Sequence, residues 1–319
     1  MGPSIDTNTT AEKEKEFLAC IENVYPRIRS YYRGIQLLKD ERIICYDYYR
    51  ENKIKIYKYI DKKFILDFEF KIENEELGAT SLYEIEENII IFGGFKKIFL
   101  YDIRNNIAKQ LQTIEIDFDN FFSQIIELSN GLIATHNTSD IIFFKYDREN
   151  KKLEKKDEIK NNGYGGVNKI FETKNGNIIS FSSEIFVYGK DKSIQSKMKL
   201  NQKYPDVNVL DGKYILISYI NDNQDKYFVD VYDINKLLLK QTLEVKYDLR
   251  QFIRLNDNLI VASDNNGNII ELNIDNNDEL SVKDIFRAHE CPISQICKFD
   301  DNKLLSISHD GTVKLWEFN

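Results

Sequence analysis

Short apolar runs recur along this chain at a nearly constant spacing, and each one ends in an aromatic or polar residue. Consecutive end positions differ by 44, 45, 42, 44, 41 and 43 residues. Each run is rich in β-branched and aromatic residues, so the pattern predicts strands rather than helices. The runs end at Tyr57, Tyr101, Tyr146, Tyr188, Tyr232, Asn273 and Trp316.

Turn signals separate the strands within each repeat. Asn-Gly or Asp-Gly pairs stand at strand junctions, where glycine tolerates the positive φ of a tight hairpin. Only four prolines occur, so the strands keep their backbone donors. A period of roughly 40–45 residues with four strands per unit is typical of a β-propeller. The sequence therefore predicts an all-β, seven-bladed β-propeller with four-stranded antiparallel blades.

The predicted domain organisation is a leader over residues 1–24 and one propeller over residues 25–319. Thr9 and Glu12 fit a capping box, and helix formers follow, so we predict a short helix over residues 10–22. The repeats are expected near residues 34–71, 79–116, 122–160, 167–200, 207–245, 249–286 and 292–319.

The last repeat carries a specific motif. Residues 285–318 contain an Ala-His pair at His289, a turn aspartate at Asp310 and a Trp-Glu pair at Trp316. This stretch closely resembles a WD repeat, with Ala-His in place of Gly-His and Trp-Glu in place of Trp-Asp. The resemblance implies a hydrogen-bonded set that stiffens the blade, formed by His289, Ser306 or Ser308, Asp310 and Trp316. The other six repeats lack the motif, which indicates a divergent member of the family.

The resemblance also implies how the ring closes. In WD-repeat proteins the third strand of a blade carries the tryptophan and a fourth strand follows, but here only three residues follow Trp316. We therefore expect residues 25–32 to pair beside residues 313–318 as a closing strand, which removes an exposed sheet edge. The kelch family is a weaker match, because the double glycine Gly93-Gly94 occurs once and the kelch period is ~50 residues.

Composition narrows the functional class. The net charge of −8 argues against a broad nucleic-acid interface, and no apolar run approaches the ~18 residues of a membrane span. The four cysteines form no CxxC pair, so we expect reduced thiols in a cytoplasmic protein without a metal site.

A search for catalytic chemistry finds no constellation. Of the three histidines, His289 and His309 have expected structural roles in the last blade, and His136 is expected in a solvated turn. The glycines near residue 165 lack the lysine of a phosphate loop, and residues 264–268 lack the acidic ligands of a calcium loop. We therefore predict no catalytic residues, no cofactor and no enzymatic activity.

The favoured interpretation is a scaffold or adaptor that binds a protein or peptide at the channel mouth, as one domain or subunit of a larger assembly. Two alternatives stay open: a propeller hydrolase or lyase with carboxylates in the channel, and a phosphoinositide-binding propeller, although its Phe/Leu-Arg-Arg-Gly motif is absent. Aromatic and arginine residues of the loops are enriched at binding hot spots. The predicted contact residues are Tyr49, Arg50, Phe95, Tyr164, Tyr204, Tyr247, Arg250 and Arg287.

Overall fold

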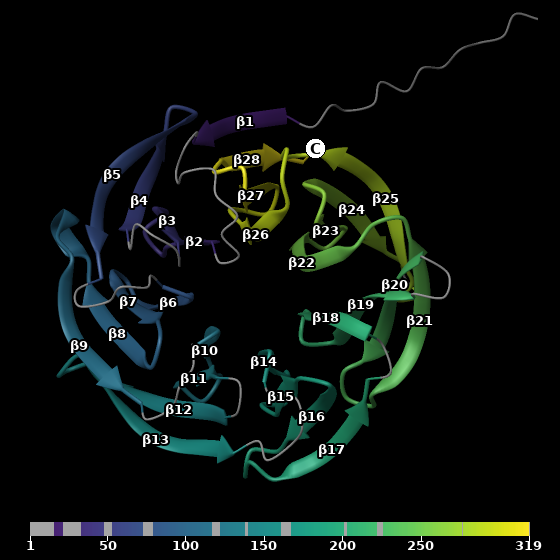
Figure 1. Cartoon of the computed structure of the whole chain (residues 1–319), viewed down its shortest axis with the longest axis horizontal. Coiled ribbons are helices and arrows are strands. Elements are labelled where there is room, and N and C mark those ends of the chain that lie inside the picture. The colour runs from purple at the N-terminus through teal and green to yellow at the C-terminus, as the bar shows by residue number, and fades with distance from the viewer. Residues whose placement is uncertain are drawn as a thin grey trace, which may run out of the picture.

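Seven four-stranded antiparallel sheets stand side by side around a central axis in the computed structural model (Figure 1). The described residues are 16–21, 33–47, 53–72, 79–116, 122–137, 140–160, 167–200, 203–221, 226–275 and 277–318. They contain 28 strands and one short 3-10 helix, η1 (Arg104–Asn106), and no α-helix. The predicted seven-bladed β-propeller is confirmed.

Each blade has its first strand at the central axis and its fourth strand at the rim. Blade 1 comprises β2 (Arg33–Leu37), β3 (Ile43–Asp47), β4 (Lys53–Ile60) and β5 (Lys63–Lys71). Blade 2 comprises β6 (Ser81–Glu86), β7 (Ile89–Gly93), β8 (Lys97–Asp102) and β9 (Lys109–Glu115). Blade 3 comprises β10 (Gln124–Glu127), β11 (Leu132–His136), β12 (Asp140–Asp147) and β13 (Lys152–Lys160).

The remaining blades repeat this order. Blade 4 comprises β14 (Lys169–Glu172), β15 (Ile178–Phe181), β16 (Glu184–Tyr188) and β17 (Ile194–Lys199). Blade 5 comprises β18 (Lys203–Leu210), β19 (Tyr214–Asn221), β20 (Lys226–Asp233) and β21 (Leu238–Val245). Blade 6 comprises β22 (Leu249–Asn256), β23 (Leu259–Asp264), β24 (Asn268–Ile274) and β25 (Leu280–Arg287), and blade 7 contains β26 (Ile293–Lys298), β27 (Lys303–Ser308) and β28 (Val313–Glu317).

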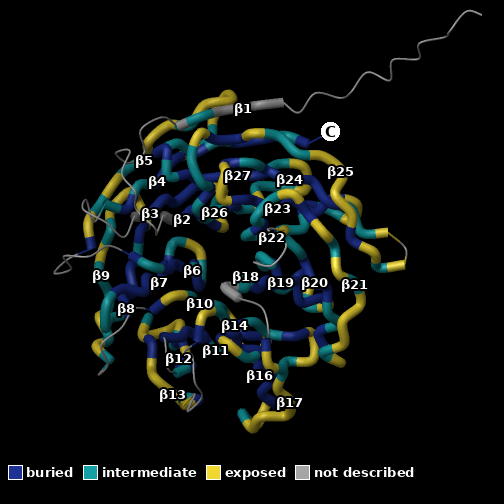
Figure 2. Tube along the Cα trace, turned by 45° about the vertical axis from the view of Figure 1, so that its right-hand side comes forward, coloured by how far each residue is buried: buried dark blue, intermediate teal, exposed yellow. Residues whose placement is uncertain are grey.

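Apolar side chains fill the seven junctions between neighbouring blades. Seven buried clusters occur, and each one draws its residues from two adjacent blades. The cluster between blades 1 and 7, for example, joins Ile43 and Tyr57 to Leu305 and Leu315. The middle strands are buried on both faces, whereas the fourth strands are largely exposed (Figure 2). Burial on both faces explains why the second strands are continuous apolar runs.

The fourth strand of blade 7 comes from the amino-terminal part of the chain. β1 (Glu16–Ile21) pairs antiparallel with β28, with Ala19 opposite Leu315 and Ile21 opposite Val313. The helix predicted over residues 10–22 is therefore wrong at residues 16–21, and the predicted closing strand over residues 25–32 lies outside the described residues. Helix formers in this segment favour a helix only weakly, and pairing with the open edge of β28 overrides that preference.

We predict that deletion of residues 1–21 lowers the melting temperature by more than about 5 °C and promotes aggregation, because the edge of β28 becomes unpaired. Thermal unfolding and size-exclusion chromatography measure the two effects. A truncated chain that melts like the full chain and stays monomeric would contradict the role assigned to β1.

Candidate functional site

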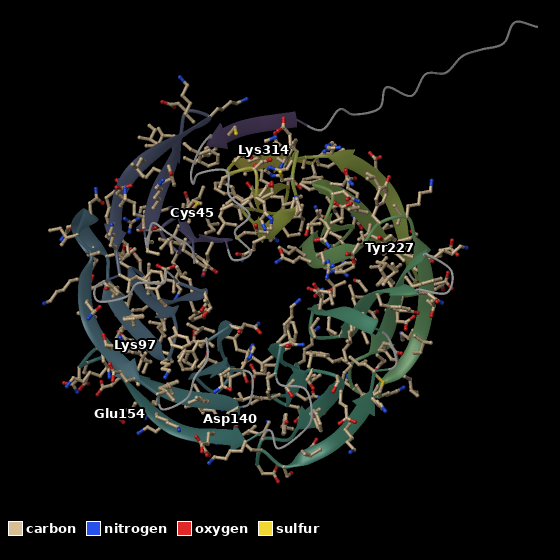
Figure 3. The ribbon with its side chains drawn as sticks, in the orientation of Figure 1. Cys45, Lys97, Asp140, Glu154, Tyr227 and Lys314 are labelled. Carbon is tan, nitrogen blue, oxygen red and sulfur yellow. The ribbon has the colours of Figure 1, made fainter. Side chains whose placement is uncertain are left out.

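The first strands of the blades surround a central cavity of about 550 Å³ that opens at one end of the axis. We call this end the upper face; it is the end at which each first strand begins. Side chains border the central opening in Figure 3. The lining residues are Tyr46, Thr80, Ser81, Leu82, Ser123, Gln124, Ile125, Asn168, Lys169, Phe171, Asn208, Gln251, Phe252, Ile253, Ser294, Gln295 and Ile296.

Three glutamines of the channel wall bind the backbone of the next blade. The Ile170 amide donates to Gln124 Oε1 over 2.9 Å, which connects blades 3 and 4. The Ile296 amide donates to Gln251 Oε1 over 2.8 Å, which connects blades 6 and 7. At the closing junction, the Ile35 amide of blade 1 donates to Gln295 Oε1 of blade 7 over 2.9 Å. We call these contacts the glutamine latches.

Other polar side chains connect further junctions at the same depth. The Ser81 hydroxyl donates a hydrogen bond to the Phe122 carbonyl over 3.0 Å, between blades 2 and 3. Lys169 donates to Asp206 over 2.5 Å, between blades 4 and 5. Asn208 donates through Nδ2 to the Arg250 carbonyl over 2.6 Å, between blades 5 and 6. Together with the glutamine latches, these contacts connect six of the seven pairs of neighbouring blades at the channel wall, all except blades 1 and 2.

The described wall of the cavity is nearly neutral. Lys169 is its one charged residue, and that ammonium group is paired with Asp206. No aspartate, glutamate or histidine belongs to the lining. Gln124 and Gln295 have no hydrogen bond to another described residue through their amide nitrogens. These two donors can therefore bind a carbonyl group of a ligand.

The predicted contact residues are only partly described by the structure. Tyr49, Arg50 and Tyr164 lie outside the described residues, and Tyr204 belongs to β18 without a described side chain. Phe95 is half-buried in the β7–β8 turn, with the ammonium group of Lys96 5.4 Å from its ring centre.

The other three predicted residues already have contacts within the chain. Tyr247 packs against the cluster between blades 5 and 6. Arg250 forms ion pairs with Asp248 at 2.5 Å and with Asp206 at 3.9 Å. Arg287 is exposed and donates to the His289 carbonyl over 3.2 Å. None of these three points to a ligand by itself.

The polar wall of the channel was not predicted as a site, although an amide or serine near the start of most first strands is a signal visible in the sequence.

The motif residues of blade 7 meet in one hydrogen-bond chain. Trp316 Nε1 donates to Ser306 Oγ over 3.0 Å. The Ser306 hydroxyl therefore donates its own hydrogen to His289 Nε2, 2.7 Å away, and His289 Nδ1 donates to Asp310 Oδ2 over 3.2 Å. The Ser308 hydroxyl contacts the carbonyls of Cys291 and Pro292 and accepts from the Asp310 amide over 3.2 Å, so it supports the same turn without contacting His289 or Trp316.

These hydrogen bonds link a serine, a histidine and an aspartate in the same order as in a catalytic triad. The three residues are buried, so their role is structural. Ser306 is 0% exposed and His289 is 2% exposed, so no substrate reaches the hydroxyl. Burial lowers the pKa of His289 and keeps the imidazole neutral. Burial acts to raise the pKa of Asp310, but hydrogen bonds from His289 and Thr312 outweigh it and hold that pKa well below its ordinary value. The set fixes the β27–β28 turn against the loop at His289.

His136 differs from its prediction. It ends β11 and is 0% exposed rather than solvated in a turn, and Nδ1 donates to the Asn137 carbonyl over 3.1 Å. Burial lowers its pKa to about 4. Among the described residues, no group of three or more His, Cys, Asp or Glu side chains is placed to hold a metal ion.

Replacement of Ser306 by alanine should lower the free energy of unfolding by about 2–3 kcal/mol, because Trp316 Nε1 and His289 Nε2 would both lose their buried hydrogen bond to the Ser306 hydroxyl. Urea denaturation measures the change. A loss below about 0.5 kcal/mol would contradict the cooperative set.

His136 should make stability pH-dependent. Its pKa is about 4 in the folded chain and 6.5 ordinarily, so the unfolded chain takes up the proton first and stability falls as pH drops from about 6.5 towards 4. The variant His136→Asn keeps a donor for the Asn137 carbonyl. We expect its free energy of unfolding to fall by about 2 kcal/mol less than that of the wild type between pH 8 and pH 5. Equal losses in urea titrations would refute this assignment.

Comparisons with known proteins show the fold. No protein-family model matches the sequence, and no curated protein matches it. A chain in the crystal structure of a mitotic checkpoint complex is similar, with 10% identity, a TM-score of 0.77, and coverage of 100% of this chain and 97% of that one. The WD40 domain of Pan2 from Neurospora crassa is also similar, with 9% identity, a TM-score of 0.71, and coverage of 95% of each chain. This chain is therefore a seven-bladed β-propeller with the fold of WD40 domains, and the WD-repeat motif is concentrated in its last blade.

Proposed function

We propose that the chain is a non-catalytic protein-interaction module that binds an extended peptide or a loop of a partner protein at the channel mouth. The observation that carries this proposal is the nearly neutral cavity of about 550 Å³, whose wall presents unpaired amide donors. Cavities of roughly 300–1,000 Å³ with a few placed polar groups are typical ligand sites. A peptide backbone presents carbonyl groups that match such donors.

The surroundings of the cavity support a protein partner. Leu82, Phe171 and Phe252 belong to the lining, so an inserted side chain would contact apolar groups between the polar ones. Phe95 lies in the β7–β8 turn and Arg287 ends β25 at the same face, so both would extend the contact. One structurally similar chain comes from the crystal structure of a mitotic checkpoint complex, which favours a role in an assembly.

The two alternative functions need chemistry that the described wall lacks. A hydrolase or lyase in the channel needs an acid and a base, typically carboxylates or histidine, and none lines the cavity. A phosphoinositide site needs a cluster of cations, whereas Lys169 is single and already paired. These observations favour binding over catalysis.

We also propose that the protein acts in the cytoplasm. No disulfide joins Cys20, Cys45, Cys291 or Cys297, as expected in a reducing compartment. Within the described part of the chain, no helix is long and apolar enough to cross a membrane.

A bulky substitution at the cavity mouth tests the proposal. Asn168 is exposed, and its side chain has no hydrogen bond to another described residue, so Asn168→Trp narrows the opening without removing a contact. We expect the amount of bound partner recovered by affinity purification and mass spectrometry to fall at least about tenfold. A tenfold change corresponds to a loss of ~1.4 kcal/mol of binding free energy. Lys174→Trp, at an exposed turn far from the channel mouth, is the matched control. An unchanged set of partners with Asn168→Trp would exclude the channel mouth.

A further inference from the structure

Within the described part of the channel wall, the junction between blades 1 and 2 has no connecting side chain. In blade 4, Lys169 precedes Ile170 and contacts the next blade. Gly34 holds the same place in β2, before Ile35, whose amide binds a glutamine latch as the Ile170 amide does. Because glycine has no side chain, blade 1 does not reach blade 2 at this depth.

Tyr46 fills the place that Gly34 leaves open. The two residues are opposite each other in the pairing of β2 with β3. A Cβ atom at residue 34 would overlap the Tyr46 ring and hydroxyl, so the glycine allows the ring to extend past the first strand. Tyr46 is accordingly the one residue of a second strand in the described lining of the cavity.

The Tyr46 hydroxyl has no partner within the described chain. The residue is 8% exposed, yet no hydrogen bond joins its hydroxyl to another described residue. Buried tyrosine hydroxyls usually have a hydrogen-bond partner. Burial raises the pKa of Tyr46, so the phenol stays protonated and can donate. A buried donor that reaches the cavity without an acceptor indicates that a ligand supplies one.

Gln295 provides a second donor beside the same glycine. Its Oε1 accepts from the amide of Ile35, the residue after Gly34, and its Nε2 has no hydrogen bond to another described residue. A glutamine on the rim uses both ends: Gln241 accepts from the Leu280 amide over 2.7 Å and donates to the Leu280 carbonyl over 2.8 Å. The free end of Gln295 therefore lies in the channel wall, next to the tyrosine hydroxyl.

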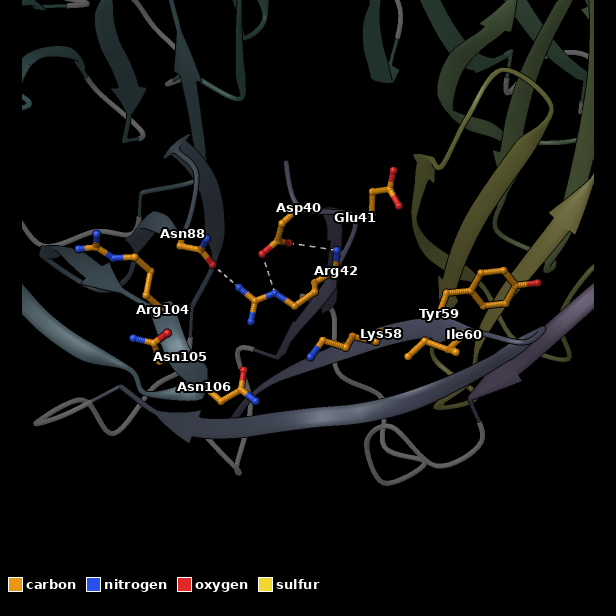
Figure 4. Close-up of a pocket in the computed structure, with 10 residues that line it drawn as sticks. All are labelled: Asp40, Glu41, Arg42, Lys58, Tyr59, Ile60, Asn88, Arg104, Asn105 and Asn106. Carbon is orange, nitrogen blue, oxygen red and sulfur yellow. Dashed lines mark hydrogen bonds and ion pairs between the residues drawn. The ribbon is translucent and has the colours of Figure 1, made fainter.

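The second cavity of the chain contrasts with the channel. It has a volume of about 420 Å³ and lies between blades 1 and 2 on the lower face (Figure 4). Arg42 is the one buried residue of its lining, and it donates to Asp40 over 2.8 Å and to Asp67 over 3.2 Å. Figure 4 also shows its contact with Asn88. The buried donor of that cavity is thus engaged within the chain.

Two neutral donors without a cation select a neutral acceptor. A carboxylate would lose its hydration here without gaining an ion pair. The one charged residue of the described lining, Lys169, belongs to blade 4 and is paired with Asp206. The net charge of −8 also disfavours anions. An amide carbonyl carries no net charge and has two lone pairs, one for each donor.

We propose that the Tyr46 hydroxyl and the Gln295 side-chain amide together bind an amide carbonyl of the partner at the channel mouth. This carbonyl belongs either to an asparagine or glutamine side chain or to a peptide bond. The inference rests on the function proposed above and names the chemical group that the channel recognises.

Titration with small molecules, followed by NMR, tests this recognition. Acetamide represents an asparagine or glutamine side chain, N-methylacetamide represents a peptide bond, and acetate is the charged control. The signal to follow is the Ile35 backbone amide, because it is bonded to Gln295. We expect saturable shifts with at least one amide, at an affinity at least about fivefold above that of acetate, as for one net hydrogen bond. The amide that binds more tightly identifies the source of the carbonyl.

Two variants assign the binding to the two donors. Tyr46→Phe should weaken amide binding about fivefold. Its melting temperature should not fall, because the hydroxyl has no partner in the described chain. Gln295→Glu keeps an acceptor for the Ile35 amide but replaces the free donor with a carboxylate oxygen, so it should abolish amide binding.

Matched controls make the same changes away from the channel. Tyr146→Phe removes a buried hydroxyl between blades 2 and 3, and Gln241→Glu alters a glutamine on the rim. Both should bind the amides like the wild type. Absence of saturable shifts with both amides, equal affinity for acetate, or unchanged affinity in Tyr46→Phe would overturn the proposal.

Failure of this inference is distinguishable from failure of the proposed function. If Asn168→Trp loses its protein partners but the wild type binds neither amide, only the recognition by Tyr46 and Gln295 is wrong. If Asn168→Trp keeps its partners, the channel mouth is not the place where they bind.

Discussion

Packing between neighbouring blades is the interaction on which the whole structure depends. A four-stranded blade cannot bury its apolar residues alone, and here every blade buries both of its faces against two neighbours. Every blade has a neighbour on both faces only when the ring is closed. The pairing of β1 with β28 completes blade 7 and covers its outer edge.

Polar groups near the axis give the channel its chemical character. Apolar clusters hold the blades together, but the first strands converge on a channel in which amide and hydroxyl groups connect adjacent blades. Because most of these groups are neutral, the channel mouth offers hydrogen bonds without a strong field.

The repeat was predictable because its signal is local. A strand that ends near Tyr101 or Tyr188 and a turn at Gly131 are encoded by neighbouring residues, so the number of blades followed from spacing alone. The hydrogen-bonded set of His289 and Trp316 was also accessible, because one repeat retains the motif.

Features that depend on pairing between distant segments were not predictable. Residues 16–21 have helix formers, and only the edge of β28, almost 300 positions away, makes them a strand. His136 was expected in solvent because its neighbours are polar, yet it ends β11 and is buried. The partner of Gln295 is the amide of Ile35, 260 positions away, and this contact exists only after the ring closes.

Amide hydrogen exchange tests the closed ring most directly. The Ile35 amide gains its acceptor, Gln295 Oε1, only when blade 7 contacts blade 1. We expect Ile35 to exchange as slowly as the amides of the middle strands, and to exchange much faster in Gln295→Met while Ile170 stays protected. Rapid exchange at Ile35 in the wild-type chain, or exchange that is insensitive to this substitution, would contradict the account.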